Sequence, residues 1–535
     1  MPVLVPRGYP WGTVKIADVL ARERLTLTEF ARRAGVSVAA MSRYASGQQI
    51  PRPDAMRRLA EASNGLVGPS DFYAPAGQGH DHPDPAMAAR HFLDSHPEVR
   101  HIDLVIADTN GVCRGKRASR AEAVEVIDHG LKLVGSLFGL DIHGENVEET
   151  GLGMETGDRD QIAVPVDGRI LPMPWVGPDA AQMLLTLLSE EGEPFFADPR
   201  QVLSGIVGQF REIGLNPVVA CELEFYLIDR SRTELGGPQP VASPFSGRRD
   251  WSTQVLSLDE MDAHRQVLAD ITAAMEAQGV PVTGALSEYA PGQFEINTHH
   301  VADAATACDH AILFKRTVRS VARRHGIDAT FMAKPYGGIS GSGLHVHVSL
   351  ADDKGRNAFA PGQPQADERL RHAVGGLMRA MAESMAVFAP NANSFRRFQL
   401  GSYAPVAPTW GFENRTVSLR VPGGDARARR VEHRVCGADA NPYLAVAAIL
   451  GAMHCGLTER LDPGPPIEGN AYDLVAPSLP RHWSNALDAY DDGTVLPRYF
   501  GERYHQHYGR LRRAEFERYQ AEVNPLDHAW YLDRL

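Results

Sequence analysis

The 535-residue sequence contains only five cysteines, at positions 113, 221, 308, 436 and 455, and no two of them form a CxxC pair. An odd number of scattered thiols argues against a disulfide framework and against a cysteine zinc site. This usage is typical of reduced thiols, and we therefore expect a cytoplasmic protein.

Long apolar runs are also missing. The N-terminus, MPVLVPRGYPW, has no signal-peptide core, and the longest apolar segment, Tyr443 to Met453, is too short to span a bilayer. Neither GxGxxG nor GxxxxGK[ST] occurs, so any nucleotide must be held in another way. With 43% hydrophobic residues, the chain has enough apolar material for a soluble protein of more than one domain.

Charge is unevenly distributed along the chain. Residues 1–70 contain ten Lys and Arg against five Asp and Glu, whereas the whole chain has a formal net charge of −12. A basic head on an acidic body indicates two modules with different partners.

The basic head has a helix–turn–helix pattern. Thr26 to Glu29 has the form of a capping box, Gly35 ends the first short helix, and Ser37 can cap a second from Val38 to Tyr44. The segment from Thr26 to Ala62 resembles Cro/repressor-type helix-turn-helix domains, whose second helix enters the major groove of DNA. The resemblance implies DNA contacts by Arg32, Arg33, Ser37, Ser42, Arg43 and Arg52. The alternative is a small helical docking module.

Residues Tyr73 to Pro85 are rich in Pro, Gly, Asp and His and are typical of an interdomain linker. After them, Val99 to Lys116 predicts two strands joined by a turn at Asn110-Gly111.

The most informative stretch is the apolar run Pro217 to Ile228, which contains Glu222 and Glu224. Side chains two apart share one face of a strand, so the two carboxylates would lie together. Neighbouring carboxylates lose hydration and repel each other unless cations compensate. An edge strand with one wet face is the alternative interpretation.

Similar features follow downstream. Glu288 and Glu295 flank a Pro-Gly turn, and a glycine-rich loop leads into a strand with His345 and His347 on one face. Carboxylates and imidazoles on strand faces suit hard divalent cations, and arginines from separate strands suit phosphates and carboxylates. The combination indicates phosphoryl transfer by an ATP-dependent ligase or kinase.

From about His91 to the C-terminus, the chain resembles the glutamine synthetase family. The matching motifs occur in the family's order: the ExE strand, E…PGQFE, KP…GSGLHVH, NSFRR, NR…LR and RRVEHR…ANPYL. The resemblance implies an α+β fold in which a small β-grasp domain precedes a catalytic domain with a curved antiparallel sheet. It also implies homo-oligomers, usually two stacked hexameric rings. We expect a helix-turn-helix domain at 1–72, a linker at 73–90, the β-grasp domain at 91–190 and the catalytic domain at 191–535.

The resemblance also implies roles for individual residues, with ATP as co-substrate and Mg²⁺ or Mn²⁺ at two sites. One metal site would comprise Glu224, Glu288 and Glu295, and the other Glu222, His345 and Glu432. Glutamate would be held by Gly341, Arg397 and Arg434, and ATP by His347, Ser349, Arg420 and Arg430. Arg415 would stabilise the phosphoryl group in transfer.

Departures from the family pattern fall in the amine half of the site. Tyr403 stands where bacterial glutamine synthetases have a flap glutamate that guards the ammonium site. Where the family has DGSS, with an aspartate that helps to deprotonate ammonium, this chain has DIHGEN, so Asp141 or His143 could take that place. Ser340 replaces an asparagine.

We therefore expect an enzyme that joins the γ-carboxylate of glutamate to a small amine through γ-glutamyl phosphate, with Tyr403 in the amine site. One alternative is glutamine synthetase proper, which uses ammonia. Another is a DNA-binding regulator whose body senses a ligand with little catalysis.

Overall fold

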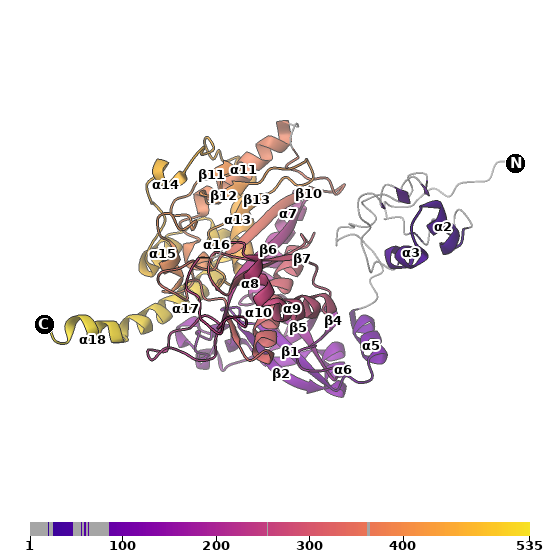
Figure 1. Ribbon diagram of the computed structural model, residues 1–535, viewed down its shortest axis with the longest axis horizontal. Helices are drawn as coiled ribbons and strands as arrows, with labels where there is room; N and C mark the ends of the chain where they lie inside the picture. Colours follow the sequence, from indigo (N-terminus) through magenta and orange to yellow (C-terminus); the bar gives the residue numbers. More distant parts are fainter. Residues whose placement is uncertain are drawn as a thin grey trace. The chain divides into compact units, whose positions relative to one another are not determined.

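The computed structural model describes residues 16, 20, 25–45, 55, 58–59, 62–63, 85–253, 255–360 and 364–535 (Figure 1). The chain divides into two compact units, Met1–His82 and Pro83–Leu535. The predicted domain boundaries at 72, 90 and 190 stay predictions. Residues 73–84 of the predicted linker lie outside the described residues, and residues 85–90 belong to a helix.

The N-terminal unit contains the two predicted short helices. Helix α2 (Leu27–Arg33) begins at a capping box, in which Thr26 accepts from the Glu29 amide and the Glu29 carboxylate accepts from the Thr26 amide. Gly35, at φ 61°, makes the turn into α3 (Val38–Ala45), where Ser37 Oγ accepts from the Ala40 amide at 3.1 Å. A small apolar core that includes Phe30 and Met41 holds the unit together.

The second unit begins with a five-stranded sheet in the order β2-β1-β5-β4-β3. Its elements are α5 (Pro85–Ser95), β1 (His101–Ala107), β2 (Cys113–Ser119), α6 (Arg120–His129), β3 (Leu131–Val134), β4 (Asp160–Pro172) and β5 (Ala180–Leu188). The predicted hairpin is confirmed, because β1 and β2 pair antiparallel around a turn in which the Gly111 amide donates to Asp108 O. Asn441 Nδ2 donates to Asp108 O at 3.0 Å, which fixes this turn to the larger lobe.

An eight-stranded sheet organises the rest of the chain, and its main path runs β11-β12-β13-β10-β6-β8-β7, with β9 paired to β6. The strands are β6 (Leu215–Ile228), β7 (Val282–Ser287), β8 (Gln293–Thr298), β9 (Asp328–Thr330), β10 (Leu344–Asp352), β11 (Trp410–Phe412), β12 (Leu419–Val421) and β13 (Val431–His433). Strand β6 lies between β10 and β8, so the edge-strand interpretation is wrong.

One face of this sheet is covered by helices. These are α7 (Pro199–Glu212), α9 (Arg265–Ala277), α10 (Ala304–Arg324) and α13 (Pro442–Glu459), with α11 (Pro364–Ala380) packed on α13. Leu223, Phe225 and Leu227 of β6 point into the apolar core beneath these helices. Because strand side chains alternate, Glu222 and Glu224 point to the opposite face.

The remaining elements of the second unit are mostly short. They are 3₁₀ turns η2 (Gly135–Gly139), η3 (Glu148–Thr150), η4 (Met154–Thr156) and η5 (Ser394–Arg397), and helices α8 (Leu258–Ala263), α12 (Met385–Phe388), α14 (Ala471–Leu474), α15 (Trp483–Asp491), α16 (Leu496–Phe500), α17 (Glu502–Ala521) and α18 (Pro525–Tyr531). Within the described part of the chain, no helix combines the length and the hydropathy needed to cross a membrane.

Candidate active site

Strand register places the predicted polar residues beside one another. In the pairing of β6 with β10, Glu222 lies opposite His345, and in the pairing of β6 with β8, Glu224 lies opposite Glu295. On the next strand, Glu432 of β13 lies opposite His347 of β10. Residues more than 200 positions apart in the sequence thus meet on one face of the sheet.

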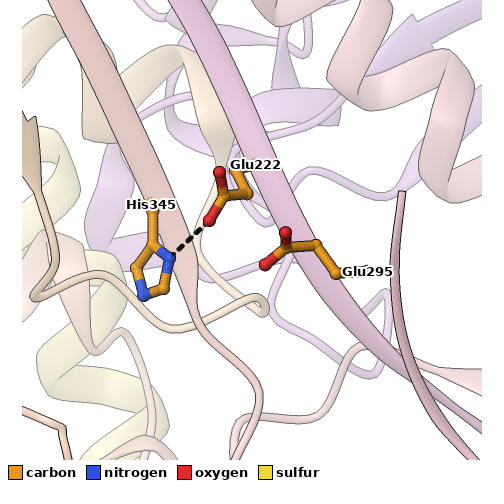
Figure 2. Close-up of side chains that lie close together, drawn as sticks. All are labelled: Glu222, Glu295 and His345. Carbon is orange, nitrogen blue, oxygen red and sulfur yellow. Dashed lines mark hydrogen bonds and ion pairs between the residues drawn. The ribbon is translucent and has the colours of Figure 1, made fainter. Parts of the chain in front are cut away.

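The potential ligand atoms form two groups that share Glu295. Glu222, Glu295 and His345 each offer an atom within 4.8 Å of the others, and so do Glu224, Glu288 and Glu295. Figure 2 shows the first group, with the His345 ring directed at the Glu222 carboxylate, Nδ1 to Oε1 at 2.9 Å. The second group coincides with one predicted metal site. The first contains Glu222 and His345 of the other predicted site, with Glu295 in place of Glu432.

Electrostatics in the cluster are unfavourable without a cation. Burial, together with the charges of Glu224 and Glu222, raises the pKa of Glu288 to about 8. Burial and the same neighbours raise the pKa of Glu295 to about 10. For Glu222, burial is outweighed by hydrogen bonds with His345 and His347, which hold its pKa well below the usual range.

These observations meet the requirements of a divalent cation site. The donor atoms are carboxylate oxygens and an imidazole nitrogen, which suit hard or borderline divalent metals. Burial and neighbouring negative charges oppose the ionisation of Glu288 and Glu295, and a bound cation would favour their ionised forms. The residues present therefore fit a divalent metal ion.

Supporting residues hold the carboxylates in place. Glu224 Oε2 accepts from the Gly343 amide at 2.9 Å and from Gln293 Nε2 at 3.3 Å, and Gln293 also donates to Gly341 O at 3.0 Å. Asn297 Nδ2 donates to Glu295 Oε1 at 2.9 Å. Gln293 and Asn297 were not predicted from the sequence. Their signal is the alternation along β8, which places both on the same face as Glu295.

Arginines predicted to bind substrates are paired within the chain. The Glu432 carboxylate accepts from Arg420 Nη1 at 2.8 Å and from Arg434 Nη1. Although burial opposes ionisation, Arg434 and the neighbouring histidines lower the pKa of Glu432 to about 2. Glu432 thus forms ion pairs with Arg420 and Arg434, and it does not belong to the group of Glu222, Glu295 and His345.

Two other predicted arginines contact the same region. Arg430 Nε donates to His347 Nδ1 at 3.1 Å. Arg397 is buried and donates to Val435 O at 2.7 Å and Arg434 O at 3.3 Å. A Cβ on Gly341 would lie 2.5 Å from Ala333 O and 3.0 Å from Arg397 Cγ, so this position requires glycine. Ser349 follows His347 on the same face of β10 and is half-buried.

A cavity of about 620 Å³ is lined by the predicted catalytic pair Arg415 and Tyr403. The other lining residues are Phe412, Glu413, Asn414, Thr416, Pro466, Ile467, Glu468 and Gly469. Tyr403 is 47% exposed and adopts a left-handed backbone conformation, φ 56°. Its ring lies 6.1 Å from that of Tyr289, which follows Glu288.

The DIHGEN loop is organised by Asp141. Its Oδ1 accepts from the amides of His143 and Glu145, both at 2.9 Å, and Oδ2 accepts from Arg518 Nη1 at 2.9 Å. The Asp141 carboxylate is buried and committed to its own loop, whereas His143 is exposed.

Comparison with known proteins identifies the lobe. The model of the glutamine synthetase catalytic domain matches residues 196–531. The chain belongs to the glutamine synthetase family. Members of this family are ATP- and divalent-metal-dependent carbon–nitrogen ligases.

Relatives of this glutamine synthetase family member include several γ-glutamyl-amine ligases. It is 40% identical to the γ-glutamylputrescine synthetase PuuA of Escherichia coli, covering 83% of this chain and 94% of that protein. It is 32% identical to the γ-glutamylethanolamide synthetase of Streptomyces coelicolor (83% and 94% covered) and 32% identical to a glutamate–isopropylamine ligase of a Pseudomonas species (84% and 98%). A solved structure of GmaS with ADP superposes with a TM-score of 0.73 at 26% identity, covering 83% of this chain and 99% of GmaS.

A helix-turn-helix domain model matches residues 20–64, which confirms the head's fold type. Of the predicted DNA-contacting residues, Arg32, Arg33 and Ser37 are exposed. The side chains of Ser42 and Arg43, and all of Arg52, lie outside the described residues.

Proposed function

We propose that this chain joins the γ-carboxylate of glutamate to a primary amine with hydrolysis of ATP, as a γ-glutamyl-amine ligase. The single observation that carries the proposal is that Tyr403 and Arg415 line one cavity, which would bring the residue assigned to the amine together with the residue assigned to phosphoryl transfer. The names of three relatives, which act on putrescine, ethanolamine and isopropylamine, support it.

Two divalent cation sites are part of the proposal. Glu224, Glu288 and Glu295 would hold one ion, and Glu222 and His345 the other, with Glu295 and Glu432 as the candidates to complete it. When bound, Mg²⁺ or Mn²⁺ would neutralise charge on the ATP phosphates.

The surrounding residues would bind and orient the substrates. Arg397, Arg434 and Gly341 would position glutamate, and His347, Ser349, Arg420 and Arg430 would contact ATP. A γ-carboxylate oxygen of glutamate then bonds to the γ-phosphorus of ATP as ADP leaves. Arg415 would stabilise the charge on the phosphoryl group during this step, because its planar guanidinium presents several N–H donors in a fixed geometry.

The second step requires an uncharged amine. Its nitrogen lone pair bonds to the acyl carbon, phosphate leaves, and the nitrogen loses a proton to a nearby base. Asp141 is committed to Arg518 and to its own loop, so His143 is the freer of the two predicted candidates for the amine site.

Tyr403 favours a carbon-containing amine over ammonia. An aromatic face attracts an alkylammonium by about 0.5–1 kcal/mol when exposed and about 2 when desolvated. Loss of a charge-assisted hydrogen bond to ammonium costs about 1.5–3 kcal/mol. Glutamine synthetase proper is therefore the second candidate function.

The deciding experiment measures phosphate release from ATP with Mg²⁺ and glutamate across ammonia, ethanolamine, isopropylamine and putrescine. At least one alkylamine should give a higher kcat/KM than ammonia. If ammonia is the best substrate, the chain is a glutamine synthetase. If no amine stimulates glutamate-dependent phosphate release, the body is a sensing platform for a regulator.

The helix-turn-helix head favours an additional role in DNA binding. Its exposed Arg32 and Arg33 lie in the last turn of α2, just before the turn between the helices, and suit phosphate contacts. We also propose that copies of the body assemble into rings, because the resembling enzymes do so. DNA binding would then benefit from several heads presented together.

A further inference from the structure

Tyr289 and Tyr403 form an aromatic pair outside the apolar core. Their ring centroids are 6.1 Å apart with an interplanar angle of 43°, and the side chains are 40% and 47% exposed. The two rings come from separate segments, the β7–β8 turn and the loop after η5. The pair adds less to folding than a fully buried pair would, because a large part of its surface stays in water.

The position of the pair connects the two halves of the site. Tyr289 directly follows Glu288, which belongs to the carboxylate cluster, whereas Tyr403 lines the cavity that also contains Arg415. One ring of the pair is thus adjacent in sequence to a cluster carboxylate, and the other lines the cavity. An amine entering through that cavity would meet the rings on its way to the acyl group.

Backbone geometry holds one ring in place at a cost. Tyr403 has φ 56°, a left-handed backbone conformation that is unusual for a bulky side chain. Tyr289 lies on the turn between β7 and β8, directly after Glu288, so the backbone of that turn positions the second ring.

We propose that Tyr289 and Tyr403 together form the surface that binds the alkylammonium form of the substrate, which makes Tyr289 a second residue that determines amine specificity. The inference rests on the proposed ligase function. Two aromatic rings offer both a negative electrostatic face for the nitrogen and an apolar surface for the carbon chain, whereas ammonia uses only the first. The pair therefore selects for carbon-bearing primary amines.

The test compares Tyr289→Val with Tyr289→Phe. The valine variant should lower kcat/KM for ethanolamine or putrescine, whichever the parent prefers, by about fivefold to thirtyfold, chiefly through KM. Its kcat/KM for ammonia should change less than about threefold. The phenylalanine variant keeps the ring face and should retain most of the alkylamine activity.

A non-reacting probe measures binding directly. Tetramethylammonium has no lone pair to attack the acyl phosphate, yet aromatic faces bind quaternary ammonium ions. It should inhibit the unaltered enzyme competitively against the amine, and Tyr289→Val should weaken this inhibition while the KM for glutamate and for ATP stays unchanged.

Two results would overturn the inference while leaving the ligase function intact. One is an unaltered ratio of alkylamine to ammonia kcat/KM in Tyr289→Val. The other is the absence of tetramethylammonium inhibition in the parent enzyme. If the parent releases no phosphate with any amine, the proposed function itself fails, and the inference fails with it.

Discussion

Glu224 and Glu295 are directly opposite each other across the β6–β8 ladder. Like charges at such a position destabilise a sheet, and here the strands lie at the centre of a buried lobe. The pairing is retained because function requires it: the two oxygens, with Glu288, form a group that a divalent cation can bridge.

The first prediction follows from this pairing. Glu295→Gln replaces a carboxyl group whose ionisation is opposed by burial and by neighbouring glutamates with a neutral amide, so the metal-free protein should keep or increase its thermal stability. Ligase activity should fall by about 10–100-fold or more. Mutation of residues that only hydrogen-bond to a metal ligand already lowers metal affinity or activity by that factor. Thermal unfolding with and without Mg²⁺ measures the stability, and phosphate release measures the activity. Glu276→Gln, which changes an exposed carboxylate on α9, serves as the control. A variant with parental Mg²⁺ stabilisation would show that Glu295 is not a ligand.

The second prediction concerns pH. The pKa of Glu288 is raised to about 8 and that of Glu295 to about 10, so the folded, metal-free protein holds more protons here than the unfolded chain. Their contribution to stability is complete below about pH 4.5 and is lost as the pH rises through the folded values. A divalent cation replaces those protons, so the increase in Tm caused by Mg²⁺ should grow from pH 6 to pH 9. An increase in Tm that is constant over this range would contradict the protonated cluster.

The third prediction addresses the amine. Tyr403→Glu introduces the anionic side chain that bacterial glutamine synthetases have at this position. The backbone φ of 56° is unfavourable for both tyrosine and glutamate, so the substitution should change the backbone strain little. The ratio of alkylamine to ammonia kcat/KM should shift toward ammonia by about tenfold or more. Steady-state kinetics on both amines measure the ratio, and a ratio that does not move would remove Tyr403 from the amine site.

The fourth prediction separates the two units. A chain that begins at Asp84 retains α5, whose Ala89 and Leu93 are buried in the core of the five-stranded sheet. It should keep ligase activity within about twofold, because the head has its own core. A chain that begins at His96 would lose α5 and should be unstable. Loss of catalysis in the Asp84 chain would mean that the head contributes to the active site.

The fifth prediction concerns the head and DNA. If the full chain binds duplex DNA, its affinity should fall with increasing salt, and the Asp84 truncation should abolish binding. Arg32→Ala should reduce the magnitude of the slope of log K against log salt concentration by about one, because one phosphate contact is removed. Salt-insensitive binding, or none, would identify the head as a docking module.

Sequence patterns sufficed wherever the information is local. The capping box at Thr26 and Glu29, the alternation of Glu222 and Glu224, and the turn at Gly292 between Glu288 and Glu295 depend on residues a few positions apart. Such patterns fix helix starts, strand faces and turns through short-range hydrogen bonds and sterics. The ordered series of motifs also sufficed to place the chain in its family.

Only the tertiary structure decided which of these residues meet. Strand register places Glu295 opposite Glu224, where Glu295 belongs to both groups of potential ligands. The Glu432 carboxylate is instead paired with Arg420 and Arg434. The packing of two loops also brings Tyr289 beside Tyr403, which is more than a hundred residues away in the sequence. Register is set by the packing of the opposite, apolar faces of the same strands against the helices, and that packing is not local in the sequence.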